Sequence, residues 1–121
     1  MSSLQVSWSR LGAWSCMSVT GFVDYQHLEE FRAPLARYLE DAPHNHLLLN
    51  LLDTRNICSS GLGLIITAFR QLARAELELA VVCGDGHVRR VLETTRIVDH
   101  IRLFDSEETA ESAVPRRPSG V

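Results

Sequence analysis

The chain has 121 residues, which is room for one domain with a hydrophobic core, and 45% of them are hydrophobic. The formal net charge is -3 and the basic residues form no stripe, so we expect no direct binding of nucleic acid. No apolar run approaches the roughly 20 residues that cross a bilayer, and the N-terminus lacks the layout of a signal peptide. These features predict a cytoplasmic protein that does not insert into a membrane.

Cysteines and histidines give no sign of a disulfide framework or a metal site. The three cysteines, Cys16, Cys58 and Cys83, are an odd number and lie in or directly after apolar stretches, which favours reduced and mostly buried thiols. His44 and His46 are close in sequence, but no cysteine or second histidine pair stands near them at metal-binding spacing. We therefore expect no metal.

Alternating apolar residues at the N-terminus predict two strands. The first contains Leu4 to Trp8, a turn follows at 9–12, and the second strand covers 13–20. The short connection favours an antiparallel hairpin. Gly21 interrupts the second pattern and predicts a bulge or bend.

A helix is predicted over 25–41, because apolar residues recur there at helical spacing. Asp24 stands at the position of an N-cap. Pro34 lacks the backbone N–H that a helix interior uses, so we expect a kink or a break at this residue.

The centre of the chain has the pattern of a strand, a helix and a second strand. The apolar run 46–52 predicts a buried strand, 60–74 an amphipathic helix, and 78–83 another strand. Short links between them are typical of a right-handed parallel crossover. A third helix is expected over 86–95, and a short edge strand over 101–104.

The C-terminal part predicts one more helix and a tail. Asp105 and Glu108 have the spacing of a capping box before a helix that ends near Val114. Two prolines and a glycine make 115–121 a predicted disordered tail after a single domain, 1–114. The element order predicts an α/β fold: one mixed sheet, antiparallel at its N-terminal edge and parallel at its centre, packed with about four helices.

The segment Cys58–Gly63 is the most informative part of the sequence, because it places two serines between the buried strand and the amphipathic helix. Free backbone N–H groups and the helix dipole at such a junction favour negative charge. A phosphate on one serine would be stabilised there and could act as a switch. The alternative is that Ser60 only caps the helix.

From residue 4 to 114 the chain resembles a STAS domain, the fold of bacterial anti-sigma-factor antagonists. Ser59–Gly63 is similar to the family's Asp-Ser-Ser/Thr-Gly-Leu-Gly motif, and Gly21–Asp24 resembles its Gly-x-x-Asp. The apolar strand before the serines fits as well, and Val88–Thr95 resembles the family's third helix. The order and spacing of these parts carry the resemblance.

The resemblance implies a regulatory binding protein and not an enzyme. In this family a partner serine kinase, which doubles as an anti-sigma factor, phosphorylates the first serine after an acidic residue. That position is Ser59, with Ser60 as the lesser candidate. The unmodified protein binds the kinase and frees the sigma factor, phosphorylation ends the binding, and a separate phosphatase resets the switch. No cofactor is implied for this chain, because ATP and Mg²⁺ belong to the kinase.

The chain departs from the family pattern at two positions. Cys58 replaces the acidic residue before the serines, and Asn50 replaces an aspartate of the preceding strand, whereas Asp24 is kept. Losing two formal charges makes a phosphate easier to hold but removes groups that the kinase or phosphatase could need. We expect four residues to surround the phosphosite: Asp24, Asn50, Cys58 and Gly61. The loop 84–87 should lie near them, because both sites follow parallel strands.

Two other functions fit parts of the sequence. STAS domains also serve as small subunits of lipid-transporting ABC systems, where the domain docks on the ATPase. Cys83 and Arg89 have the Cys-x-x-Gly-x-x-Arg spacing of a cysteine-dependent phosphatase, in which a thiolate attacks phosphorus and the arginine grips the oxygens. Against the phosphatase, Arg90 stands where a hydroxyl residue is usual, and Asp85 puts a carboxylate in the loop.

Overall fold

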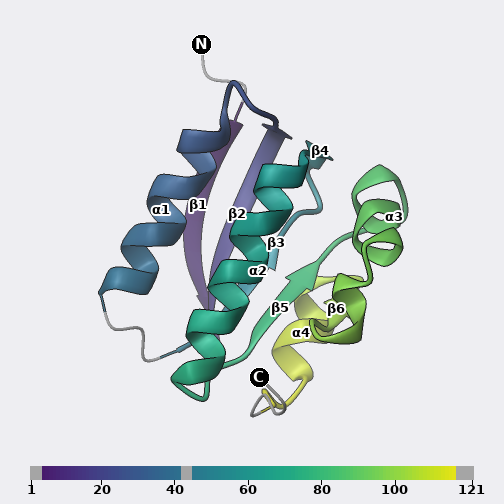
Figure 1. Cartoon of the computed structure of the whole chain (residues 1–121). Coiled ribbons are helices and arrows are strands. Elements are labelled where there is room, and N and C mark those ends of the chain that lie inside the picture. The colour runs from purple at the N-terminus through teal and green to yellow at the C-terminus, as the bar shows by residue number, and fades with distance from the viewer. Residues whose placement is uncertain (1–3, 42–44, 117–121) are drawn as a thin grey trace.

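The computed structural model describes residues 4–41 and 45–116 and has the predicted α/β fold, in which one sheet is packed with helices (Figure 1). Its elements, in chain order, are β1 (Leu4–Leu11), β2 (Trp14–Val23), α1 (Leu28–Glu40), β3 (His46–Asn50), β4 (Thr54–Ile57), α2 (Ser59–Arg74), β5 (Leu79–Val82), α3 (His87–Thr94), the 3-10 helix η1 (Ile97–Asp99), β6 (Leu103–Phe104) and α4 (Glu107–Ser112).

The sheet is mixed, as the sequence predicts. Its strand order is β1-β2-β3-β5-β6, with β4 pairing separately with the C-terminal end of β2. The hairpin β1-β2 is antiparallel and every other pair is parallel. Since β3 and β5 are parallel neighbours joined through α2, the predicted crossover is confirmed.

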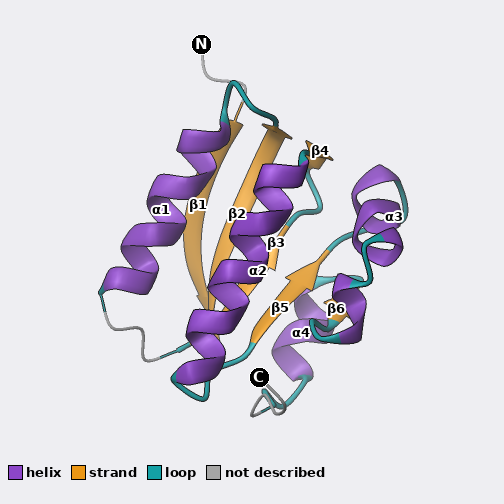
Figure 2. Cartoon of the chain, in the orientation of Figure 1, coloured by secondary structure: helices purple, strands orange, loops and turns teal. Residues whose placement is uncertain are grey.

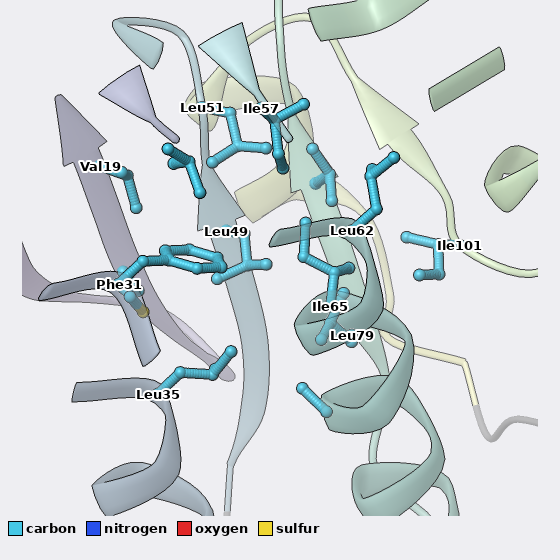
Figure 3. Close-up of a cluster of buried hydrophobic side chains, with 14 of the residues drawn as sticks. Val19, Phe31, Leu35, Leu49, Leu51, Ile57, Leu62, Ile65, Leu79 and Ile101 are labelled. Carbon is cyan, nitrogen blue, oxygen red and sulfur yellow. The ribbon is translucent and has the colours of Figure 1, made fainter. Parts of the chain in front are cut away.

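The two faces of the sheet carry cores of different size. Leu47 and Leu49 of β3 belong to a large core, in which Phe31 of α1 and Ile65 of α2 pack against the strands (Figure 3). Leu48, which points to the other face because side chains alternate along a strand, belongs to a smaller core covered by α4. The amphipathic pattern of α1 and α2 places both helices on the same face (Figure 2).

The N-terminal hairpin is longer than the sequence indicates. β1 continues through the predicted turn to Leu11, and the chain reverses at Gly12 and Ala13, where Gly12 has a φ of 59°. The expected bulge is confirmed: the pairing of β2 with β4 shifts register between Gly21 and Phe22, and Gly21 has a φ of 113°, which favours glycine.

Helix α1 differs from its prediction at both the cap and the proline. The helix starts at Leu28 with His27 as N-cap, so Asp24 is not the cap and instead closes the turn before the helix. Pro34 does not break the helix, which runs unbroken to Glu40. The buried Phe31 and Leu35 on either side of the proline hold this segment against the sheet.

The N-cap of the last helix, α4, also differs from its prediction. Ser106 is the N-cap of α4 and accepts a hydrogen bond from the backbone N–H of Thr109, so the capping box predicted from Asp105 and Glu108 is wrong. The side chain of Asp105 instead accepts a hydrogen bond from Arg89. A serine hydroxyl one residue later satisfies the same free N–H groups, and sequence spacing alone does not separate the two.

After α4 the chain returns to the body of the domain. The guanidinium of Arg102 makes two hydrogen bonds of 2.7 and 2.8 Å to the buried carboxylate of Glu78, and a third to the carbonyl oxygen of Val114. The backbone N–H of Arg116 also donates to Glu78, at 2.6 Å. The first residues of the predicted tail thus contact the domain, and 117–121 lie outside the described residues. None of the described helices is long and apolar enough to span a membrane.

Candidate functional site

Ser59 is the first residue of α2 and is exposed to solvent, at the junction where β4 ends (Figure 1). The N-cap is Cys58, whose extended backbone turns the chain into the helix without a capping hydrogen bond from its side chain. The capping role considered for Ser60 is therefore wrong, because Ser60 lies inside the helix and is half-buried. With no side-chain cap and no acidic residue in the first turn, this helix end favours an anion.

Gly61 positions this junction by allowing close packing. A Cβ atom on Gly61 would lie 2.7 Å from Cγ1 of Val23 and 3.1 Å from Cγ1 of Ile57, two buried side chains at the ends of β2 and β4. The backbone N–H of Cys58 also donates to the carbonyl oxygen of Val23, at 2.8 Å. Gly61 is buried and acts by packing, which holds the serines at a fixed place relative to β2.

Asp24 and Cys58 follow the ends of two paired strands, β2 and β4. They directly follow Val23 and Ile57, which are partners in the pairing of β2 with β4. Asp24 Oδ1 lies 2.6 Å from His27 Nδ1 and accepts a hydrogen bond from the backbone N–H of His27 at 3.0 Å. These contacts with His27 lower the pKa of the Asp24 carboxyl, so Asp24 places a negative charge beside the junction.

Asn50 lies apart from these residues. It alternates with Leu49 of the large core, so its side chain is on the face of the sheet that α4 covers. Its Nδ2 donates to Oε2 of Glu107 in α4, and its Oδ1 accepts from the backbone N–H of Leu52 at 3.0 Å. The structure therefore brings Asp24, Cys58 and Gly61 to the serine junction and directs Asn50 toward the smaller core.

The loop 84–87 lines a cavity of about 420 Å³ together with residues of β2, of β4 and of the segment that follows β3. His87 Nε2 lies 2.9 Å from Oδ1 of Asn56, which ties the start of α3 to β4, two residues before Cys58. The loop thus lies beside the segment that leads into the serines. The cavity lining consists of Phe22, Leu51, Leu52, Thr54, Arg55, Cys83, Gly84, Asp85, Gly86, His87 and Val88, without the serines or Asp24.

The geometry of Cys83 and Arg89 argues against a phosphatase. Cys83 is only 1% exposed, and burial raises the pKa of its thiol, which favours the neutral form over a nucleophilic thiolate. The guanidinium of Arg89 is engaged by carboxylates, at 3.1 Å from Asp105 and 3.6 Å from Glu93. A phosphate loop needs the opposite arrangement, a reactive thiolate and an arginine that is free to bind phosphate oxygens.

Exposed apolar side chains at the same end of the sheet are a feature that the sequence reasoning missed. Phe22 is 41% exposed, Leu52 44% and Tyr25 71%. The signal was present in the sequence: Phe22 and Tyr25 stand on either side of Val23 and Asp24, and alternation along β2 sends Phe22 away from the large core. We call Phe22, Tyr25 and Leu52 the apolar patch.

Comparison with known proteins shows which family has this sequence pattern and fold. The model of the STAS domain family matches residues 10–110. An anti-sigma factor antagonist from Mycobacterium paratuberculosis has a similar structure, with a TM-score of 0.75 and 19% identity over 92% of this chain and 96% of that one. The anti-sigma factor antagonist SpoIIAA in its unphosphorylated form gives 0.70 and 18%, over 89% and 93% of the two chains. Bacillus SpoIIAA in its phosphorylated form gives 0.67 and 16%, over 88% and 97%.

Proposed function

We propose, from the premise that this chain belongs to the STAS domain family, that it acts as an anti-sigma-factor antagonist in a partner-switching system. Its partner is a serine kinase that doubles as the anti-sigma factor, and a cognate phosphatase resets the switch. Ser59 is the phosphorylation site and Ser60 the lesser candidate. The structural similarity to antagonists, one of them in a phosphorylated form, supports this role.

The observation that carries the proposal is the exposure of Ser59 at the start of α2. A kinase can transfer phosphate only to a hydroxyl that it can reach, and the hydroxyl of an exposed first helical residue meets that requirement. The half-buried Ser60 is less accessible to a kinase. The first turn of α2 holds no acidic residue that would repel the added phosphate, so the positive end of the helix dipole can stabilise it.

The phosphate changes binding through its charge. A phosphoserine carries about -1.5 to -2 at neutral pH. In the free protein the helix terminus and water stabilise this charge, whereas in a complex the partner surface removes the water. The nearby carboxylate of Asp24 adds a like charge beside the same interface. A complex stabilised by a few kcal/mol would then dissociate.

The apolar patch supports docking of a protein partner at this end of the domain. Its three side chains surround the carboxyl ends of β2 and β3, close to the turn that leads to α1 and to the strand that precedes Ser59. Partly exposed aromatic residues are frequent anchors in protein interfaces. Phe22 and Tyr25 therefore provide the binding energy, and phosphorylation of Ser59 controls whether the complex forms.

Intact mass after incubation with the cognate kinase and ATP tests the proposal. Wild type should gain one phosphate, Ser59→Ala should gain none, and Ser60→Ala, the matched control, should still gain one. Phosphorylated wild type should no longer co-elute with the kinase in size-exclusion chromatography. Unchanged mass in wild type while the two proteins still bind would overturn the switch, and phosphate on Ser59→Ala but not on Ser60→Ala would move it to Ser60.

A further inference from the structure

The residues 113–116, which follow α4 and which we call the C-terminal segment, are attached to the domain through one buried carboxylate. Glu78 lies directly before β5, and its carboxylate accepts hydrogen bonds from the guanidinium of Arg102 and from the backbone N–H of Arg116. Arg102 also donates to the carbonyl oxygen of Val114, at 3.0 Å. These two attachments place the C-terminal segment near the start of β5 (Figure 1), and both depend on the pairing of Glu78 with Arg102.

A histidine contacts the backbone of the same glutamate. His46, the first residue of β3, accepts at Nδ1 a hydrogen bond of 2.9 Å from the backbone N–H of Glu78. The carbonyl oxygen of Glu78 accepts another from the backbone N–H of Leu47, also at 2.9 Å, so β3 holds the backbone of Glu78 in place. Only an unprotonated ring nitrogen can accept a hydrogen bond. The contact therefore requires the neutral form of His46, with its hydrogen on Nε2.

The surroundings of the His46 ring favour this neutral form. The ring is half-buried, and its centroid lies 5.7 Å from that of the buried Trp14. Burial lowers the pKa of His46, although the nearby carboxylate of Glu78 acts to raise it. Two more charged groups belong to the elements packed here: Arg102, which is paired with Glu78, and Glu111 of α4, whose side chain lies against the β1-β2 turn.

We propose that protonation of His46 releases the C-terminal segment from the domain, so that His46 and Glu78 form a pH-sensitive switch. When Nδ1 takes up a proton from water it becomes a donor, and it then faces the donor N–H of Glu78, so their hydrogen bond is lost. Because β3 holds the backbone of Glu78, the imidazole ring has to turn.

The charge of the protonated ring carries the change to the C-terminal segment. The imidazolium attracts the carboxylate of Glu78 and competes with the groups that this carboxylate already binds. The carboxylate keeps its bidentate contact with the charged guanidinium of Arg102 and gives up the weaker bond to the uncharged backbone N–H of Arg116. The switch lies at the amino end of β3, whereas the serine junction follows the carboxyl end of β4, and it does not depend on the function proposed above.

NMR relaxation of the ¹⁵N-labelled full chain, measured from about pH 7.5 to about pH 5, tests the switch. The nitrogen shifts of the His46 ring report its protonation in the same samples. We expect the amide order parameters of Val114 and Arg116 to fall from about 0.85 to below about 0.6 as the pH is lowered. The midpoint of this fall should equal that of the His46 titration and lie below the ordinary histidine pKa of about 6.5.

Three variants separate the switch from other effects of acid. His46→Asn does not titrate, and its amide oxygen can still accept from Glu78, so its C-terminal segment should stay ordered at every pH. His100→Asn is the matched control: His100 contacts the ring of Phe69 instead, and this variant should release the segment as wild type does. Glu78→Gln weakens the attachment itself and should lower the order parameters at neutral pH.

The proposal is overturned if the order parameters of the C-terminal segment do not change with pH in wild type, or if their midpoint differs from that of His46. It is also overturned if His46→Asn shows the same change as wild type, if His100→Asn abolishes it, or if Glu78→Gln leaves the segment ordered at neutral pH.

Discussion

The side chain of Asn50 donates a hydrogen bond from Nδ2 to Oε2 of Glu107, over a distance of 2.5 Å, and so joins β3 to α4. The same amide accepts a hydrogen bond at Oδ1 from the backbone N–H of Leu52. The thiol of Cys16 lies 3.6 Å from the same Glu107 oxygen. An amide fits this position because it donates and accepts at once, whereas an aspartate, the residue usual in the family, would face Glu107 with a second negative charge.

We therefore expect Asn50→Asp to lower the free energy of unfolding by about 1–3 kcal/mol at neutral pH. The loss should shrink in acid, where a carboxyl takes up a proton and can donate again. Urea unfolding at neutral and at acidic pH measures this loss of unfolding free energy. The double variant Asn50→Asp with Glu107→Gln should recover most of the stability, and a double variant as unstable as the single one would contradict the pairing.

Gly61 should be sensitive to the smallest side chain. Gly61→Ala brings a methyl group to 2.7 Å from Val23 Cγ1, and because Val23 is fully buried, we expect a loss of about 1–3 kcal/mol in unfolding free energy. Gly63→Ala in the same helix is the matched control. Apart from its chain neighbours and the backbone of its own helix, no atom of the described residues lies within 4 Å of a Cβ at Gly63, so helix propensity should stabilise this variant by about 0.5–1 kcal/mol. Equal effects in thermal unfolding would contradict the close packing.

The carboxyl of Asp24 should titrate below the ordinary aspartate range, because His27 stabilises its charged form. The direction in which stability changes with pH follows from linkage. A lowered pKa in the folded state stabilises the fold above the ordinary pKa of the carboxyl, and this contribution is lost as the pH falls through the folded-state pKa. His27→Ala should raise the pKa of Asp24. NMR of the side-chain carboxyl carbon measures both values, and an identical pKa in the two proteins would rule out the contact.

The three thiols should differ in reactivity. Cys16 and Cys83 are 0% and 1% exposed, and burial raises the pKa of each, whereas Cys58 is half-exposed at the start of α2. Ellman's reagent at about pH 8 should modify one thiol of the native protein, and the other two only in denaturant. Cys58→Ser should abolish the native reaction. Rapid modification of Cys83 would restore the case for a thiolate there.

Several elements were predictable because their evidence is local. The helical spacing of apolar residues gave α2 within one residue of its start, and the apolar run ending at Leu52 gave β3. The mixed sheet followed from the order of strands and helices and from short links. β4 was not predicted, because its four residues, Thr54–Ile57, have no apolar pattern of their own and form a strand only by pairing with β2.

The sequence by itself determined the family, the large core and a serine at the start of a helix, because apolar periodicity and a short motif are properties of neighbouring residues. Only the tertiary structure decided where Asn50 points and that Ser59 is exposed. Both depend on segments far apart in the chain: α4 brings Glu107 to Asn50, and the pairing of β4 with β2 sets the place where α2 begins. Such contacts are fixed by how layers pack, and local sequence does not encode them.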